Sequence, residues 1–204
     1  MEYMESYNSA ALAKRLYESG FTLYTRQTLA DILAIKKEST LFNVINRFMQ
    51  SGILIRIEKD KYRRSDTKGE DFALANFLYA PSYISFETAL NFYGILSQFP
   101  HEITSATIRK SVQKHADNRL FSYTHIKKTL YWGYYKKGSY LVAEPEKALA
   151  DQLYMSAKGF KRMGLDEYSL SNVSFTKLKQ YLACYPQIRQ VTSRIREVRR
   201  FLSI

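Results

Sequence analysis

The sequence predicts an α+β protein of two domains, residues 1–68 and 69–204. Residues 9–65 combine helix-period segments with short stretches of alternating apolar and polar residues, the patterns typical of helices and strands. The polar segment SDTKGED (65–71) contains Gly69 and no apolar residue, which indicates a linker. Helix-like and strand-like segments follow it, so the second domain is expected to be a mixed α/β domain with a helical tail.

The first domain is expected to begin with a helix, a short strand and a second helix. Gly20 suits the position just past a helix over residues 9–20, and FTLYT (21–25) is a strand candidate. Thr25 is expected to cap the second helix, RQTLADILA. The apolar side chains expected to face the core are Leu12, Leu16, Leu29, Ile32 and Leu33.

A third helix is expected over residues 38–51, with Gly52 just past its end, after a turn at residues 35–37. At about 100° per residue, its apolar positions share one face, and the opposite face is polar and contains no acidic residue. The apolar positions are Leu41, Val44, Ile45, Phe48 and Met49. The polar positions are Ser39, Thr40, Asn43, Asn46, Arg47 and Gln50.

Residues 53–65, ILIRIEKDKYRRS, predict a β-hairpin that turns at residues 59–61 and returns through Tyr62. Its first strand alternates, and the expected apolar face consists of Ile53, Ile55 and Ile57. Three helices followed by a two-stranded hairpin predict a winged helix-turn-helix, in which the third helix enters the major groove of DNA and the hairpin contacts the backbone or minor groove.

The polar side chains of the third helix suit direct contacts with bases, because Asn and Gln pair with adenine, Arg with guanine, and Ser or Thr with either. Basic side chains of the hairpin suit phosphate contacts, which give affinity but little sequence information. The residues predicted to contact DNA are Lys36, Lys37, Ser39, Thr40, Asn43, Asn46, Arg47, Arg56, Lys59, Lys61, Arg63 and Arg64. A solvated helix face and a protein-interaction module are the alternative interpretations.

The second domain is expected to contain two helices, two strands, a hairpin and three more helices. In order these are a helix over 71–80 ended by Pro81, a helix over 86–93 capped by Ser85, strands over 102–110 and 120–128, a hairpin over 131–144 with its turn at 137–139, a helix from Pro145 to 157, a helix from Ser174 or Thr176 to Cys184, and a last helix after Pro186.

The chain is basic, with 31 Lys and Arg against 19 Asp and Glu and a formal net charge of +12, which favours an anionic partner. Residues 1–70 carry 12 basic and 9 acidic side chains, and residues 71–204 carry 19 and 10, so the excess is greater in the second domain. The last helix adds a basic face, which is either solvated or a surface for DNA or an acidic partner. Its residues are Arg189, Arg196, Arg199 and Arg200.

The sequence shows no constellation typical of an enzyme, and no cofactor or metal site is expected. The single cysteine, Cys184, excludes an internal disulfide, the three histidines lack metal-ligand spacing, and no glycine-rich phosphate-binding loop occurs. Lys147 and Asp151 are four residues apart, which predicts an ordinary pair on a helix surface rather than part of a nuclease site. We expect the histidines at the surface and Cys184 to be buried or incidental.

The N-terminal segment MEYMES lacks the basic and apolar regions of a signal peptide. No apolar run approaches the ~20 residues that span a membrane. These features predict a soluble cytoplasmic protein without a membrane partner.

Residues 81–109 and 121–154 resemble the second domain of the AbiEi family, the antitoxins of bacterial abortive-infection type IV toxin–antitoxin systems. The resemblance lies in three blocks: PSYISFETALNFYG, EITSAT, and AEPEKALADQLY, which runs from Ala143 to Tyr154. With the predicted winged helix it covers most of the chain. One departure is Asp60-Lys61-Tyr62, where the family often has Gly before the Tyr, so the turn geometry is expected to differ.

The resemblance implies an antitoxin and transcriptional autorepressor without enzymatic activity. The winged helix would bind inverted repeats in double-stranded DNA of its own promoter. The second domain would counter a cognate nucleotidyltransferase-like toxin, and this need not involve a stable complex. The alternative is a winged-helix transcription regulator whose second domain binds a ligand or another protein.

Overall fold

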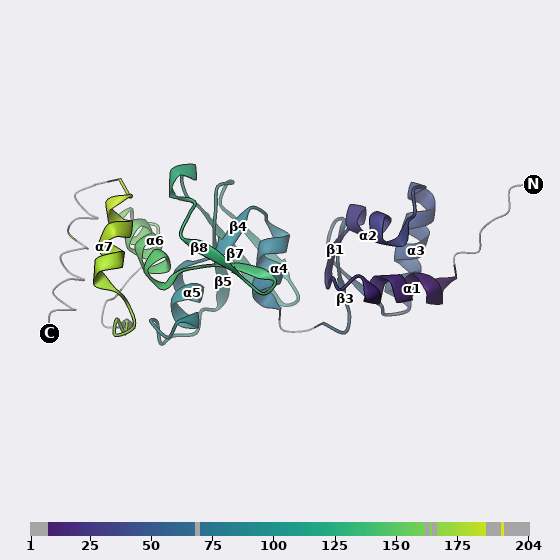
Figure 1. The fold of residues 1–204 in the computed structure, drawn as a ribbon, viewed down its shortest axis with the longest axis horizontal. Coiled ribbons are helices and arrows are strands. Elements are labelled where there is room, and N and C mark those ends of the chain that lie inside the picture. Colours follow the sequence, from purple (N-terminus) through teal and green to yellow (C-terminus); the bar gives the residue numbers. More distant parts are fainter. Residues whose placement is uncertain (1–7, 68–69, 162–163, 165–166, 187–192, 194–204) are drawn as a thin grey trace, which may run out of the picture. The chain divides into compact units, whose positions relative to one another are not determined.

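The computed structural model describes residues 8–67, 70–161, 164, 167–186 and 193. The chain divides into two compact units, residues 1–70 (unit 1) and 71–204 (unit 2). The described residues form seven α-helices, one short 3₁₀ helix and two β-sheets, which confirms the α+β class (Figure 1).

Unit 1 has the element order helix, strand, helix, helix, hairpin. These elements are α1 (Ser9–Glu18), β1 (Leu23–Thr25), α2 (Arg26–Leu33), α3 (Glu38–Gln50), β2 (Leu54–Glu58) and β3 (Lys61–Arg64). The three strands form an antiparallel sheet in the order β1-β3-β2. Every helix and strand expected in this part of the sequence is therefore present.

Local side chains explain where these helices begin and end. The Asn8 side chain accepts a hydrogen bond from the Ala10 N–H at the start of α1, and Thr25 Oγ1 accepts one from the Thr28 N–H at the start of α2. Gly20 follows α1 with φ +71°, which suits a residue without a Cβ. Ala34 ends α2 at φ 55° and starts the four-residue connection to α3.

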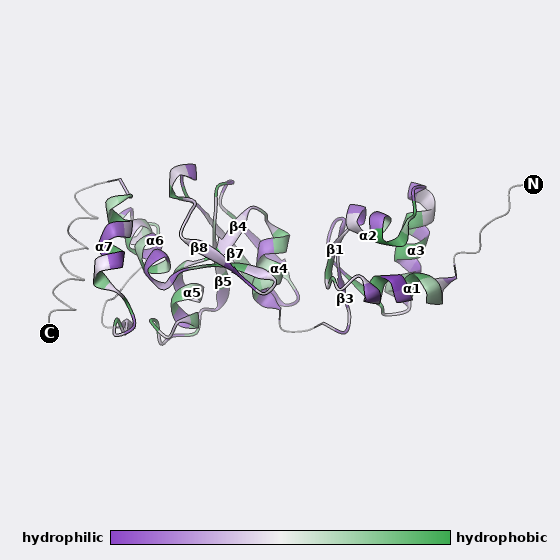
Figure 2. Ribbon diagram, viewed as in Figure 1, coloured by the Kyte–Doolittle hydropathy of each residue, from purple (hydrophilic) through white to green (hydrophobic). Residues whose placement is uncertain are grey.

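The helices of unit 1 pack around one apolar core, as their two-sided hydropathy indicates (Figure 2). The predicted inward residues of α1 and α3 are buried, except for Met49, which is partly buried. In α2, Leu29 and Leu33 are buried and Ile32 is partly buried. This packing fixes the rotation of each helix, and hence which side chains of α3 face outward.

The predicted apolar face of the hairpin is wrong. Leu54 is the core residue of β2, whereas Ile55 is 38% exposed and Ile53 and Ile57 are half-buried. An irregularity between Arg56 and Glu58 breaks the simple alternation that the prediction assumed. The turn contains two residues, Lys59 and Asp60, because Glu58 pairs directly with Lys61.

Unit 2 contains a six-stranded mixed sheet in the order β6-β7-β5-β4-β9-β8. The strands are β4 (Ser82–Ile84), β5 (Glu102–Thr107), β6 (Val112–Ala116), β7 (Arg119–His125), β8 (Tyr134–Lys137) and β9 (Tyr140–Ala143). β4 pairs with β9 and β5 with β7 in parallel, and the remaining pairs are antiparallel. The sequence predicted β5, β7 and the β8–β9 hairpin but missed β4 and β6, which are short or half-exposed.

Helices cover both faces of this sheet (Figure 1). α4 (Asp71–Leu78) lies on one face, α5 (Phe86–Phe92) and α6 (Pro145–Ala157) lie on the other, and α7 (Phe175–Ala183) packs against α6. The 3₁₀ helix η1 (Lys128–Leu130) connects β7 to β8. Pro145 occupies the first turn of α6 and Ser174 caps α7, as expected. The predicted last helix, after Pro186, lies outside the described residues apart from Ser193.

Candidate nucleic-acid interface

The outward face of α3 is polar. Because Leu41, Val44 and Phe48 are buried on the inner side, the predicted DNA-contacting residues Ser39, Asn43 and Arg47 are exposed. The other two predicted residues of this helix, Thr40 and Asn46, are half-buried. The five side chains therefore share one surface of a single rigid element, and no acidic side chain of α3 lies among them beyond Glu38 in the first residue.

The connection before α3 places two cations at the helix start. Lys36 and Lys37 are exposed, and Ile35 between them and α2 is buried, which anchors the connection to the core. Lys37 is the N-cap residue and its side chain makes no capping hydrogen bond. A helix N-terminus with adjacent lysines attracts anionic groups.

Arg26 compensates the acidic residues closest to this face. Its guanidinium lies 3.5 Å from the Glu38 carboxylate and 3.6 Å from the Asp60 carboxylate, and its backbone N–H donates to the Asp60 carbonyl. It thereby connects the start of α2, the start of α3 and the hairpin turn. We infer that Arg26 orients these elements rather than standing free for a ligand.

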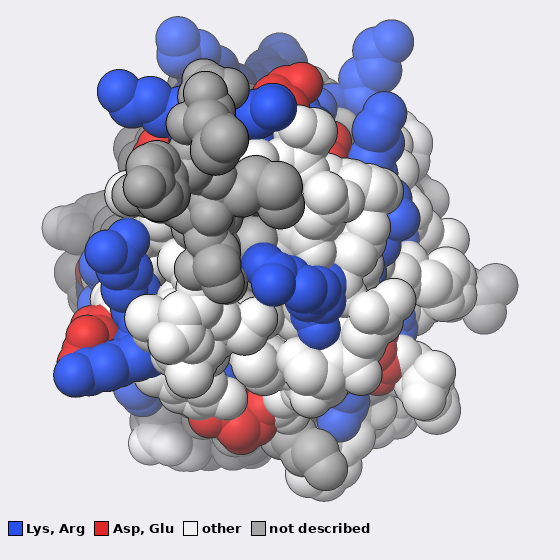
Figure 3. All heavy atoms as spheres, turned by 90° about the vertical axis from the view of Figure 1, so that its right-hand side faces the viewer, with Lys and Arg blue, Asp and Glu red and all other residues white. Residues whose placement is uncertain are grey.

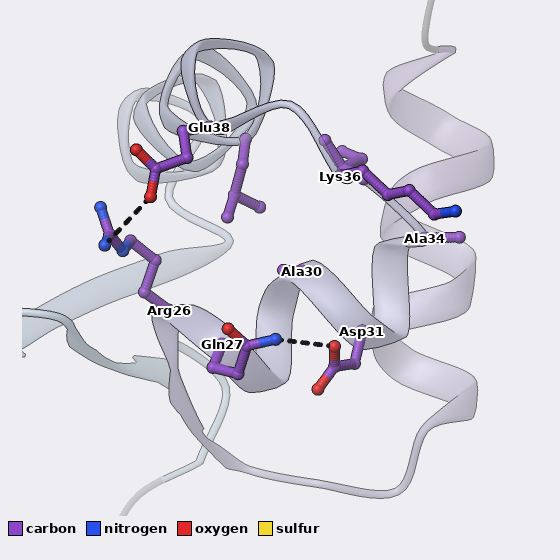
Figure 4. Close-up of a pocket in the computed structure, with 9 residues that line it drawn as sticks. Arg26, Gln27, Ala30, Asp31, Ala34, Lys36 and Glu38 are labelled. Carbon is purple, nitrogen blue, oxygen red and sulfur yellow. Dashed lines mark hydrogen bonds and ion pairs between the residues drawn. The ribbon is translucent and has the colours of Figure 1, made fainter.

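A groove of about 540 Å³ runs beside these residues, between α2 and α3. Figure 4 shows Arg26 paired with Glu38 and Gln27 bonded to Asp31 across its floor, with Lys36 extending away from them. Both carboxylates that line the groove are therefore engaged, and the accessible cation of its rim is Lys36.

The basic residues of the hairpin differ in their surroundings. Lys61 pairs with Glu58 at 3.0 Å, and Arg64 pairs with Asp66 at 2.6 Å while covering the Tyr17 ring. Arg63 donates to the Thr67 carbonyl at 2.8 Å, so it stabilises the segment after the hairpin. Arg56 and Lys59 are exposed, and no acidic partner is recorded for them in the described part of the chain. The hairpin therefore offers fewer available cations than its composition suggested.

Basic side chains are scattered over the surface in the view of Figure 3, with acidic ones in a few places near its margin. Such a distribution suits contacts to several separate phosphates more than to one compact anion. The predicted basic face of the last helix, Arg189, Arg196, Arg199 and Arg200, lies outside the described residues.

Phe42 was not singled out from the sequence, although a helical wheel shows it. It lies at about 300° from Ser39, at the border of the polar and apolar faces of α3. Its side chain is 64% exposed, and no ring or cation contact is recorded for it among the described residues of unit 1. Phe42 could have been identified from the sequence, because it is an aromatic residue that lies between the polar and the apolar face of the predicted helix.

The expectation that Lys147 and Asp151 form a surface pair is wrong. Both side chains are completely buried, with Lys147 Nζ 2.5 Å from Asp151 Oδ1. Helix α6 packs against α5 on one side and α7 on the other, and all its residues from Glu146 to Met155 are buried. The sequence contained a sign of this, because apolar residues surround α6 on every side and leave no wholly polar face.

Three hydroxyl groups complete this buried network. Tyr83 and Ser85 donate to Asp151 Oδ2 at 2.9 and 2.8 Å, and Tyr185 donates to Asp151 Oδ1 at 2.6 Å. Ser85 occupies the predicted N-cap position of α5 but uses its hydroxyl here instead of capping. Burial lowers the pKa of Lys147, an effect that Asp151 opposes, and burial raises the pKa values of Tyr83 and Tyr185.

The surroundings of Lys147 are aromatic and close-fitting. Its ammonium group lies 4.9 Å from the ring centres of Trp132 and Tyr185. Gly133, at φ +72°, passes so close to the Lys147 stem that a Cβ there would lie 3.0 Å from Cγ. A completely buried ion pair whose hydroxyl and aromatic partners all come from outside α6 is typical of a structural core.

The remaining candidate groups are at the surface. His101, His115 and His125 are exposed as expected, and the free Cys184 is exposed at the end of α7. No group of three His, Cys, Asp or Glu side chains that could hold a metal ion occurs among the described residues. Within the same residues, no helix is long and apolar enough to cross a membrane. No protein-family model and no curated protein matches the chain.

Proposed function

We propose that the protein binds double-stranded DNA in a sequence-specific manner and represses its own promoter. In this proposal residues 1–70 form a winged helix-turn-helix, α3 enters the major groove, and the β2–β3 hairpin contacts the backbone. The observation that carries it is the exposed polar face of α3, which presents Ser39, Asn43 and Arg47 on a helix fixed by a buried core. The proposed function is binding without catalysis.

For unit 2 we propose the activity implied by its resemblance to AbiEi-family antitoxins, which is to counter a nucleotidyltransferase-like toxin. The resembling motifs contain Tyr83, Ser85, Lys147 and Asp151, which meet in the buried network. These residues are inaccessible to another protein, so we assign them to stability. Contact with a toxin, where it occurs, would use other residues of unit 2.

DNA binding is tested by footprinting the full-length chain on the promoter region of its own gene. We expect protection of an inverted repeat, and we expect Arg47→Ala to weaken binding by about tenfold or more, as for loss of one good base contact. The same variant should discriminate less between operator and altered sequences. Unchanged affinity and unchanged sequence preference would remove Arg47 from the interface, and absence of any protected site would contradict the proposal.

Antitoxin activity is tested by growth. The open reading frame next to this gene is induced alone, with the full chain, or with a full-length Arg47→Ala variant. We expect arrest by the neighbour and relief by both forms of the chain, because the relief is assigned to unit 2. Persistent arrest with well-expressed protein, or a harmless neighbour, would leave a transcription regulator whose second domain binds a ligand or another protein.

A further inference from the structure

We propose that Phe42 is a specificity-determining residue that contacts the C5-methyl group of a thymine in the major groove. This inference rests on the proposed DNA binding by α3. It adds an apolar contact to the hydrogen bonds proposed for the polar residues of that helix, and it predicts that the recognised sequence contains a thymine in each half-site.

Phe42 lies on α3 close to the residues proposed to contact bases. It is one turn after Ser39 and one turn before Asn46, and it directly precedes Asn43. Residues three and four apart on a helix are neighbours on its surface. A helix that presents Ser39 and Asn43 to base edges therefore holds the Phe42 ring at the edge of the same surface.

Phenylalanine has no hydrogen-bonding group, and the C5-methyl of thymine is the apolar mark that the major groove offers. An aromatic side chain that is 64% exposed gains free energy when such a group covers it. Lys36 and Lys37 are exposed just before α3 and Arg47 is exposed on it, whereas Glu38, four residues before Phe42, is paired with Arg26. The charge of this region therefore favours DNA over a protein as the partner of the ring.

The other exposed aromatic residues of unit 1 differ from Phe42. The Tyr17 ring lies under the Arg64 guanidinium at 4.7 Å, so it already has a partner. Phe21 is 55% exposed but precedes β1 and lies off α3. Phe42 is thus the large apolar side chain that the proposed recognition helix itself exposes, and Phe21 is a natural control.

The test is a cycle between protein and DNA, measured by equilibrium binding of the full chain to the footprinted duplex. Each thymine is replaced in turn by deoxyuridine, which lacks the methyl group and keeps every hydrogen-bonding position. For wild type we expect one thymine in each half-site at which the replacement weakens binding by about fourfold, the value for one buried methyl group. Phe42→Ala should bind the two duplexes equally at that position.

Phe21→Ala is the control, because it removes an exposed ring elsewhere in unit 1. Thr40→Ser tests the rival contact, because it removes the methyl group of a predicted DNA-contacting residue and keeps the hydroxyl. Both should keep the wild-type preference for thymine. Equal sensitivity of wild type and Phe42→Ala, or loss of the preference in Thr40→Ser alone, would overturn the assignment to Phe42.

A second copy of the chain, in place of DNA, is the competing partner that would cover the Phe42 ring. Gel filtration of free wild type and Phe42→Ala distinguishes the two, and a change of oligomeric state in the variant would overturn the proposal. Failure of the wild-type chain to bind any promoter duplex would instead contradict the proposed function itself, so the two failures are distinguishable. Because Phe42 is exposed, we expect the variant to unfold at the wild-type temperature.

Discussion

Asp151→Ala is expected to destabilise unit 2 by about 3–5 kcal/mol, the cost of breaking a buried ion pair from one side. The substitution leaves the Lys147 ammonium group, which is completely buried, without its counter-charge. It also removes the acceptor of the Tyr83, Ser85 and Tyr185 hydroxyl groups. Few single substitutions in this unit would remove as many buried interactions.

The unfolding of unit 2 can be followed by the intrinsic fluorescence of the protein. Trp132 is its single tryptophan, and the indole ring lies beside Lys147, Tyr181 and Tyr185. Urea unfolding followed by tryptophan fluorescence therefore monitors unit 2 at the site of the change. Far-ultraviolet circular dichroism monitors the helices of both units.

A matched control is available on α1. Lys14 and Glu18 have the same order and the same four-residue spacing as Lys147 and Asp151, but their side chains are 75% and 63% exposed. Glu18→Ala should change stability by less than about 0.5 kcal/mol, as is usual for such surface pairs. A loss below about 1 kcal/mol for Asp151→Ala would mean that Lys147 does not depend on this carboxylate.

A second substitution separates charge from packing. In Lys147→Met/Asp151→Ala the unpaired ammonium group is absent, so the double variant should be more stable than Asp151→Ala alone. If both variants lose the same stability, the hydroxyl hydrogen bonds and the packing of α6, rather than the buried charge, account for the loss. Any loss of the proposed antitoxin activity in Asp151→Ala would follow from unfolding.

Much of unit 1 could be predicted because its elements are defined by local chemistry. The sequence shows Thr25 as a helix cap and Gly20 and Gly52 as helix stops. It also shows the 3.6-residue spacing of the apolar residues Leu41, Val44 and Phe48. The face of the hairpin could not be predicted in the same way. An irregular residue shifts the alternation of a strand, and tertiary packing selects Leu54 over Ile55 for the core.

Unit 2 shows the limits of sequence patterns more clearly. The three-residue strand β4 lies between two predicted helices, in a stretch to which the sequence assigned no element, and its place in the middle of the sheet depends on pairing with β5 and β9. The burial of Lys147 and Asp151 depends on α5, α7 and β4 all packing around α6. A spacing of four residues is the same at a surface and in a core, so spacing alone cannot distinguish them.

The sequence could predict which types of residue form the candidate interface, but not which of their basic side chains are already paired within the chain. Composition assigned Lys61, Arg63 and Arg64 equal weight with Lys36 and Lys37. The structure ties Lys61 to Glu58, Arg64 to Asp66 and Arg63 to a backbone carbonyl. Lys36 and Lys37 are exposed at the start of α3, so we expect them to carry more of the phosphate contact than the hairpin does.

This difference leads to the prediction with the largest expected effect on binding. In Lys36→Ala/Lys37→Ala, the plot of log affinity against log salt concentration should become shallower by about 1.8, from ~0.9 for each lost phosphate contact. Affinity should fall at low salt, while the ranking of operator and mutated operator sequences should stay the same, because phosphate contacts carry little sequence information. The measurement is a salt titration of binding to the footprinted duplex.

Lys14→Ala provides the matched control, since it removes one exposed lysine of unit 1 on α1 rather than at the start of α3. Its salt slope should equal that of wild type if the contacts are local. If Lys14→Ala and the single Lys36→Ala and Lys37→Ala variants all lower the slope equally, net charge and not the start of α3 would explain the binding. Arg64→Ala tests whether a paired cation of the hairpin contributes less to phosphate contact. Because the Arg64 guanidinium is already paired with Asp66, we expect the salt slope to fall by less than ~0.9. A fall by the full ~0.9 would show that Arg64 leaves Asp66 when DNA binds.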